Sequence, residues 1–161
     1  MYWVTPVVVA AIAALGFAGA TFAAEMECAP DRLDIRGDFG EARFTVELAD
    51  EPQEQRLGLM FRESLAASQG MLFVYPWPGS PSFWMRNTLI PLDMLFITPG
   101  GVVQHVHAEA IPHDETPING GQGVLAVLEI KGGLAEAIGI EAGDQIRHPA
   151  FGATAAWACE N

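Results

Sequence analysis

Residues 92–107 read Leu-Asp-Met-Leu-Phe-Ile-Thr-Pro-Gly-Gly-Val-Val-Gln-His-Val-His. An apolar run from Leu92 ends at Ile97, and a second apolar-rich run begins at Val102. Proline and two glycines stand between them, and these residue types form tight turns because of their backbone angles. Two strand-like runs joined by such a turn predict a β-hairpin.

Further strand-like segments lie on both sides of this hairpin. They are the alternating segment 43–49, the apolar runs 70–75 and 124–130, the segment 83–88 before a kink at Pro91, and a short strand after Gly143. Two short helices are expected, one from Asp50 to about Leu57 and one over 134–138 that Gly139 closes. Strands outnumber helices and follow one another without long helical crossovers. We therefore expect a β-rich α+β domain, a small curled sheet or partly closed barrel with one or two short helices.

The composition limits the classes of partner. The chain has 161 residues, with 8 lysines and arginines against 20 aspartates and glutamates, so its formal net charge is −12. This length fits one domain. An acidic surface repels phosphate backbones and anionic lipid headgroups, which argues against nucleic-acid binding and against basic membrane patches. A small polar ligand is the partner class that the composition leaves open.

The N-terminus indicates export. Residues 1–24 contain no charged side chain, and the apolar run 7–17 is typical of a signal peptide. Cleavage after Ala23 or Ala24 would place the mature protein outside the cytoplasm, in the periplasm or the medium. The alternative is an uncleaved membrane anchor, because Val4 to Ala24 is long enough to cross a bilayer. The remaining chain divides into an extension over 25–42, a domain over 43–148 and a tail over 149–161.

The two cysteines, Cys28 and Cys159, stand near the two ends of the mature chain. An oxidising compartment allows them to pair, and the termini of a domain often lie close together. We therefore expect a disulfide that joins the two ends. The alternative is a pair of free thiols in the terminal tails.

Several motifs resemble the DUF192 family, a domain of unknown function. The resemblance rests on Phe83-Trp84-Met85-Arg86-Asn87-Thr88-Leu89-Ile90-Pro91-Leu92-Asp93, together with Arg56-Leu57-Gly58-Leu59-Met60-Phe61-Arg62, Gly70-Met71-Leu72-Phe73, Val127-Leu128-Glu129-Ile130 and Gly143-Asp144. It covers roughly residues 44–147. It implies a compact β-rich domain, often exported behind a signal peptide, and supplies no reaction. The two cysteines lie outside the pattern.

Three charged residues stand in mostly apolar segments. Arg86 shares a predicted strand face with Trp84 and Thr88, while Asp93 and Glu129 each have apolar neighbours. A buried guanidinium needs a carboxylate partner, so we expect Arg86, Asp93 and Glu129 to converge. The predicted cleft for a small polar ligand is lined by Arg62, Arg86, Asn87, Thr88, Asp93 and Glu129. The alternative is an internal ion pair that only closes the sheet.

A second cluster contains three of the four histidines. Its members are His105, His107, Glu109, His113 and Asp114. Imidazoles and carboxylates of this kind can bind a divalent metal ion, zinc among them. The alternative is a solvated outer face of the hairpin, because no helical zinc motif is present. No other cofactor is predicted.

Three functions remain open after these observations. The first is an exported binding or accessory module that uses the arginine and carboxylate cleft. The second is a small extracytoplasmic hydrolase, with Asp93 and Glu129 as an acid and base pair or with a histidine-bound metal. The third is an envelope domain that binds a partner through the exposed aromatic residues Trp77 and Phe61.

Overall fold

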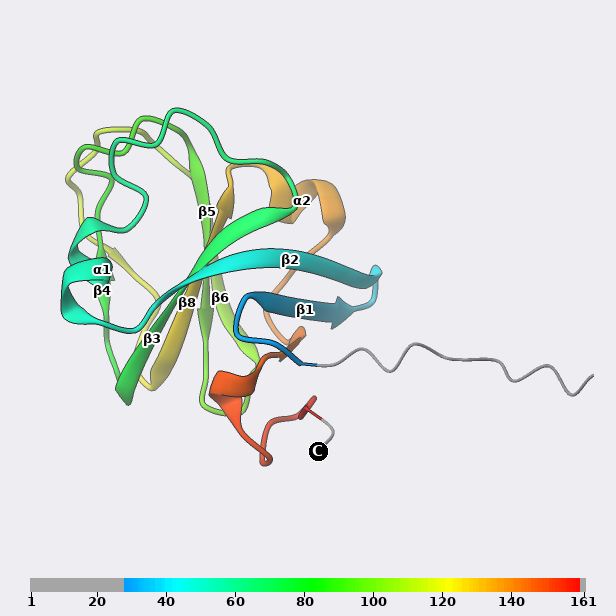
Figure 1. Ribbon diagram of the computed structural model, residues 1–161. Coiled ribbons are helices and arrows are strands. Elements are labelled where there is room, and N and C mark those ends of the chain that lie inside the picture. Colours follow the sequence, from blue (N-terminus) through cyan, green and yellow to red (C-terminus); the bar gives the residue numbers. More distant parts are fainter. Residues whose placement is uncertain (1–27, 160–161) are drawn as a thin grey trace, which may run out of the picture.

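The computed structural model of the chain describes residues 28–159. Its main element is a seven-stranded sheet accompanied by two short helices (Figure 1). The elements are β1 (Arg32–Gly37), β2 (Gly40–Ala49), α1 (Pro52–Leu57), β3 (Gln69–Gly79), β4 (Ser82–Phe83), β5 (Leu92–Ile97), β6 (Val103–Ala110), β7 (Ile118–Asn119), β8 (Val124–Lys131), α2 (Leu134–Ile138), β9 (Gln145–Arg147) and the 3-10 turn η1 (Pro149–Phe151). The expected class, a β-rich domain with two short helices, is confirmed.

The sheet curls until its two edges meet at one corner. Its strand order is β6-β5-β8-β3-β2-β1-β9, and β4 pairs with β7 in a separate two-stranded ribbon. All neighbours in the main sheet are antiparallel except β2 and β3. The turn before β6 reaches β9 through a bridge between Val102 and Gln145 and a hydrogen bond from the Ile146 amide to the Gly101 carbonyl. The result is a partly closed barrel.

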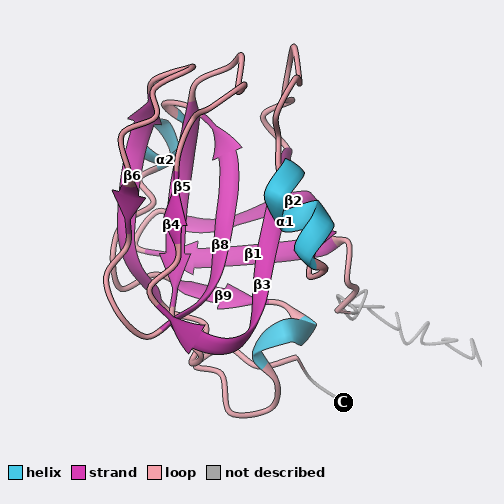
Figure 2. Cartoon of the chain, turned by 90° about the vertical axis from the view of Figure 1, so that its left-hand side faces the viewer, coloured by secondary structure: helices cyan, strands magenta, loops and turns pink. Residues whose placement is uncertain are grey.

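Each face of the sheet carries its own apolar cluster. One face packs Leu33, Phe44, Leu95 and Leu128 under α2. The other face packs Phe73, Met94, Phe96 and Val127 against the ribbon and the loop after α1. The two helices therefore lie on opposite sides of the sheet (Figures 1 and 2). β8 runs through the middle and contributes side chains to both clusters, because successive residues of a strand point to opposite faces.

The structure corrects the sequence interpretation at three places. The expected strand over 83–88 is wrong, since β4 ends at Phe83 and residues 84–91 form a loop. β1 lies within the predicted extension 25–42 and is an inner strand of the sheet, bonded to both β2 and β9. The strand predicted over 70–75 is longer than expected, because β3 continues to Gly79 after a register shift between Val74 and Gly79.

The predicted disulfide joins the two ends of the described chain. Cys28 and Cys159 are bonded, with their Cα atoms 5.8 Å apart. The tail is also held by Trp157, whose ring lies 4.5 Å from the guanidinium carbon of Arg36 and 4.6 Å from that of Arg147. The described part of the predicted tail, residues 149–159, therefore packs on β1 and β9 through Trp157.

The predicted signal peptide and the predicted anchor both fall within residues 1–27, outside the described residues. Among residues 28–159, no helix has the length and apolar character that a membrane span requires.

Candidate functional site

The candidate site is centred on Glu129 in the central strand β8. Cross-strand pairing places Met71 of β3 and Met94 of β5 directly beside it on the same face. All the other residues of β8 before Lys131 are apolar. Burial of an acidic residue among these apolar side chains costs free energy unless its carboxyl group is protonated or paired.

The Glu129 carboxylate has no partner in the described part of the chain. Glu129 is only 4% exposed, and no described residue donates a hydrogen bond to its side chain or forms an ion pair with it. Burial raises the pKa of Glu129 to about 8, because the apolar surroundings disfavour the charged form. The side chain is therefore mostly protonated at neutral pH and loses its proton just above it.

A small pocket gives access to this carboxyl group. Its cavity volume is about 90 Å³, and its polar lining residues are Gln55, Arg56, Tyr75, Ser82, Thr88 and Glu129. Burial, and in second place the charge of Glu129, raises the pKa of the Tyr75 hydroxyl to about 12. A volume of this size is well below the roughly 300–1,000 Å³ that hold a whole small-molecule ligand. The pocket fits one polar group of a ligand.

The wall on one side of the pocket is formed by α1 and the loop after it. The Gln55 amide donates hydrogen bonds to the carbonyls of Ala49 (3.2 Å) and Val74 (2.9 Å), which fixes α1 against β2 and β3. Gly58 ends the helix with a φ of +48°, and a Cβ there would lie 3.1 Å from the ring of Phe73. Glycine meets both requirements because it lacks a side chain.

Another wall of the pocket comes from the loop over 84–91, which contributes Trp84 and Thr88. The loop over 84–91 is bonded to the loop over 111–117 through the His113 amide and the Met85 carbonyl (3.0 Å), and to Phe61 through the Asn87 carbonyl (2.9 Å). The described chain has four non-glycine residues with positive φ: Asn87 and His113 lie in these two loops, Glu109 lies just before the second, and Phe61 lies in the loop after α1. Such strain persists where surrounding contacts fix it, and it is frequent at functional sites.

Asp93 is buried on the opposite face of the sheet. It pairs across the strands with Ile130, one position away from the pair of Met94 with Glu129. Its carboxylate accepts three backbone hydrogen bonds, from the amides of Glu109 (2.7 Å), Gly133 (2.9 Å) and Ala135 (2.7 Å). Asp93 therefore joins β5, the end of β6 and the start of α2, and its role is structural. It cannot form an acid and base pair with Glu129.

The expected convergence of Arg86 with the two carboxylates is wrong. Arg86 lies in the loop after β4, its side chain is 53% exposed, and its Nε lies 4.0 Å from Glu115. Its guanidinium also lies 5.5 Å from the ring centre of Trp84. The loop replaces the expected strand, so the predicted alternation does not hold. The guanidinium has solvent and an exposed carboxylate as neighbours.

The structure brings together only two of the six predicted cleft residues, Thr88 and Glu129. Arg62 is exposed and forms a bidentate ion pair with Glu47, with Nη1 2.9 Å from Oε1 and Nη2 2.6 Å from Oε2. Asn87 is also exposed, and its amide contacts the sulfur of Met60 at 4.0 Å. Neither residue lines the pocket.

The histidine cluster does not assemble. Within residues 28–159, no group of three or more histidine, cysteine, aspartate or glutamate side chains is placed to hold a metal ion. His105 stacks on Phe96 at 5.9 Å on β6, while His113 lies in the loop over 111–117. The Asp114 carboxylate accepts hydrogen bonds from the amide and hydroxyl of Thr116 and closes a local turn.

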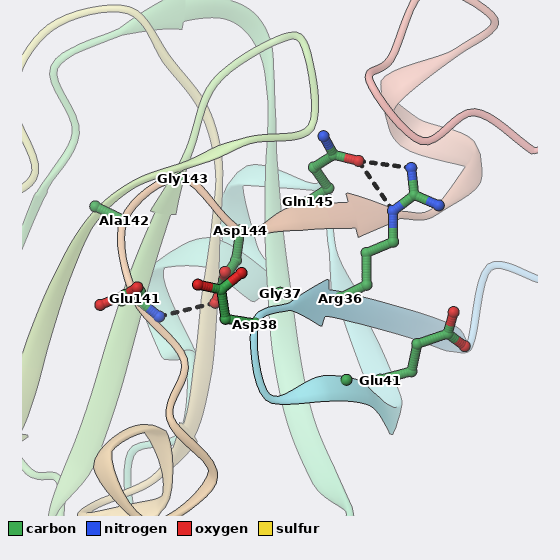
Figure 3. A pocket seen from close by; sticks show the side chains of 10 residues that line it. Arg36, Gly37, Asp38, Glu41, Glu141, Ala142, Gly143, Asp144 and Gln145 are labelled. Atoms are coloured by element: carbon green, nitrogen blue, oxygen red, sulfur yellow. Dashed lines mark hydrogen bonds between the residues drawn. The ribbon is translucent and has the colours of Figure 1, made fainter.

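A larger hollow of about 690 Å³ lies beside the turn between β1 and β2. Figure 3 shows that Asp144 in this hollow accepts a hydrogen bond from the Glu141 amide, and that the Gln145 side chain accepts two from Arg36. The other carboxylates around it, those of Asp38, Glu41 and Glu141, are exposed. These groups are bonded within the chain or reach solvent, so the hollow lacks the unpartnered buried group that marks the Glu129 pocket.

Sequence reasoning missed most of the polar lining of the pocket. Tyr75 ends an apolar run, Ser82 stands in a turn-like segment, and Gln55 belongs to an amphipathic helix, so none of them is out of place in its own segment. Only the sheet register brings them to Glu129. The one signal in the sequence was a carboxylate within an apolar strand.

Comparison with known proteins gives a family and a fold. The model of the DUF192 family, described as uncharacterised ACR, matches residues 34–148. A crystal structure of a protein of unknown function from Novosphingobium aromaticivorans is 44% identical, with a TM-score of 0.70 over 71% of this chain and 82% of that one. A proposed transcription regulator from Sinorhizobium meliloti is 36% identical, with a TM-score of 0.71 over 76% and 95% of the two chains. None of the curated proteins compared matches this sequence.

Proposed function

Because this chain belongs to the DUF192 family, for which no reaction is established, we propose its function from the pocket: a binding module that holds a cationic hydrogen-bond donor against Glu129. An ammonium or guanidinium group is the chemistry that complements a carboxylate of this kind. The observation that supports the proposal is the Glu129 carboxyl group, which is buried, without a partner in residues 28–159, and accessible only through a pocket the size of one polar group.

Free-energy considerations favour a ligand with both charge and donors. The free protein avoids a buried charge by keeping Glu129 protonated at neutral pH. A cation in the pocket would stabilise the carboxylate and release that proton. A guanidinium group is a good fit because its planar set of donors matches the two oxygens of a carboxylate. Apparent affinity should therefore rise with pH, by up to about tenfold per unit, until it levels off near the pKa of Glu129.

An extracytoplasmic location accords with this function. A disulfide persists in oxidising compartments and is rare in the cytosol. The charge-free apolar segment at the start of the chain gives independent support, since it has the features of a signal peptide. Both observations favour a mature protein that works outside the cytoplasm.

Methylguanidinium is the simplest probe of the pocket. In an NMR titration at pH 8, we expect it to shift the backbone amides of Glu129 and Tyr75 and those of the loop over 57–60. Methylurea has a similar shape and is neutral, so it should cause much smaller shifts. Glu129→Gln should abolish the response, and Glu41→Gln, which changes an exposed glutamate on β2, should leave it intact.

Two results would refute the proposed function. One is an equal response of the wild type and Glu129→Gln to methylguanidinium. The other is a set of shifted amides that lies only on the acidic outer surface, which would show that the cation binds through general charge attraction.

A further inference from the structure

We propose that the cation held by Glu129 is an arginine side chain of a polypeptide partner, which docks on the exposed apolar residues around the pocket. This inference rests on the proposed function and names its ligand. The surface is called the apolar rim and consists of Leu57, Phe61, Trp84, Leu89 and Ile111.

The apolar rim lies on the segments beside Glu129, the only buried carboxylate that lacks a partner in the described chain. Leu57 and Trp84 line the pocket itself. Phe61 is held beside the 84–91 loop by the hydrogen bond from its amide to Asn87, and His113, two residues after Ile111, donates to the Thr88 carbonyl. Figure 1 shows these three loops grouped at the end of the molecule near α1 and β4. The rim and the pocket therefore form one surface.

The rim side chains are exposed although the core is close by. Phe61 is 63% exposed and Ile111 is 66% exposed. Phe61 also has a φ of +62°, a conformation that is costly for a bulky residue. Apolar side chains that are fixed outward around a polar centre are typical of interaction surfaces, in which an apolar zone surrounds an anchor residue.

The dimensions of the pocket favour a side chain over a free metabolite. A cavity of about 90 Å³ holds the end of a side chain, and a free small cation there would leave the apolar rim in water. A polypeptide fills the pocket with one residue and covers the rim with the neighbouring ones. Arginine fits better than lysine because its planar guanidinium pairs with a carboxylate and stacks on aromatic rings, and Trp84 stands at the mouth.

Charge complementarity supports a partner from outside the chain. The protein has a formal net charge of −12, which attracts a basic segment. Residues 1–27 and 160–161 contain neither lysine nor arginine, so the parts of the chain outside the described range have no side chain of this chemistry. Arg86 stands near the rim and is exposed, so a second copy of the chain is the competing occupant that a test must distinguish.

The experiment compares two peptides by calorimetry on the mature protein at pH 8. One is the acetylated and amidated peptide Ala-Leu-Arg-Phe-Ala, and the other carries citrulline, a neutral isostere, in place of arginine. We expect the arginine peptide to bind at least tenfold more tightly than methylguanidinium and the citrulline peptide to lose at least tenfold. Phe61→Ser and Ile111→Ser, made separately, should weaken the peptide severalfold and leave methylguanidinium binding unchanged.

The possible outcomes separate this inference from the proposed function. If methylguanidinium binds through Glu129 and the peptide binds no more tightly, the polypeptide partner is refuted and the proposed function stands. If neither binds, both fail. If the rim variants bind the peptide as the wild type does, the apolar rim is not the docking surface. If the protein dimerises and Arg86→Gln dissolves the dimer, the occupant is a second copy and the proposal is overturned.

Discussion

Replacing Glu129 with glutamine should stabilise the protein at pH 8 and leave its stability almost unchanged at pH 4. The folded protein holds a proton on Glu129 up to about pH 8, whereas the unfolded chain releases it near the ordinary value of 4.5. Between these values the folded state binds more protons, so wild-type stability falls as pH rises. The difference of 3.5 units corresponds to a loss on the order of 5 kcal/mol across this range.

Urea unfolding at several pH values measures this effect. The variant should lack the decline because glutamine remains neutral at every pH, and its advantage over the wild type should reach several kcal/mol at pH 8. The other ionisable residues that line the pocket are Arg56 and Tyr75, and burial raises the pKa of Tyr75 to about 12, above this range. Glu41→Gln should show the wild-type decline. If Glu129→Gln is less stable than the wild type at pH 8, the carboxylate has a stabilising partner and the account of the pocket is wrong.

Replacing Asp93 with alanine should destabilise the protein strongly at neutral pH. The change leaves three amides without an acceptor, the buried one of Ala135 and the partly buried ones of Glu109 and Gly133. An unsatisfied group costs about 1–3 kcal/mol when it is buried, and a partly buried one lies at the low end of this range, so we expect a total loss on the order of 3–5 kcal/mol in urea unfolding. Asp38→Ala, which changes an exposed aspartate, should cost much less.

The binding of methylguanidinium distinguishes a structural role of Asp93 from a role in the pocket. Asp93→Ala should still bind methylguanidinium under conditions where it is folded, because Asp93 lies on the face of the sheet away from the pocket. A loss of binding with unchanged stability would instead place Asp93 in the site, contrary to the geometry described above.

These two carboxylates show how far the sequence could predict the site. Both stand in apolar segments, and that pattern correctly identified them as buried. Asp93 pairs across the strands with Ile130, and Glu129 pairs with Met94. The two carboxylates are therefore one position apart in the register and lie on opposite faces of the sheet, which gives them different roles. Alternation of apolar and polar residues specifies register where one face of a strand is buried, but β5 and β8 are buried on both faces, so their sequences do not show which residues pair.

The fold was predictable where local signals agree with tertiary structure. The hairpin of β5 and β6 and the two helices follow from turn residues, capping residues and apolar runs. The 83–88 segment has the composition of a strand, but its backbone groups bond to the loop over 111–117 and Asn87 adopts a φ of +54°. Tertiary contacts therefore determine the backbone conformation of this segment, and with it the position of Arg86.

β1 was missed although its sequence does contain a signal. Leu33 and Ile35 alternate with Asp34 and Arg36, which is the period of a strand with one buried face. The charged residues obscured the pattern because their partners are distant in sequence: Asp34 pairs with Arg43 of β2 and Arg147 of β9, both at 2.6 Å. A sequence read segment by segment does not show such cross-strand pairs.

If Glu129 is a buried acid that binds a cationic partner, its own titration by carbon-detected NMR should show both properties. The side-chain carboxyl resonance should titrate with a midpoint near 8 in the free protein. Saturating methylguanidinium should lower that midpoint by at least one unit, because the cation stabilises the carboxylate. A midpoint near 4.5 in the free protein, or a midpoint near 8 that methylguanidinium leaves unchanged, would contradict the claim.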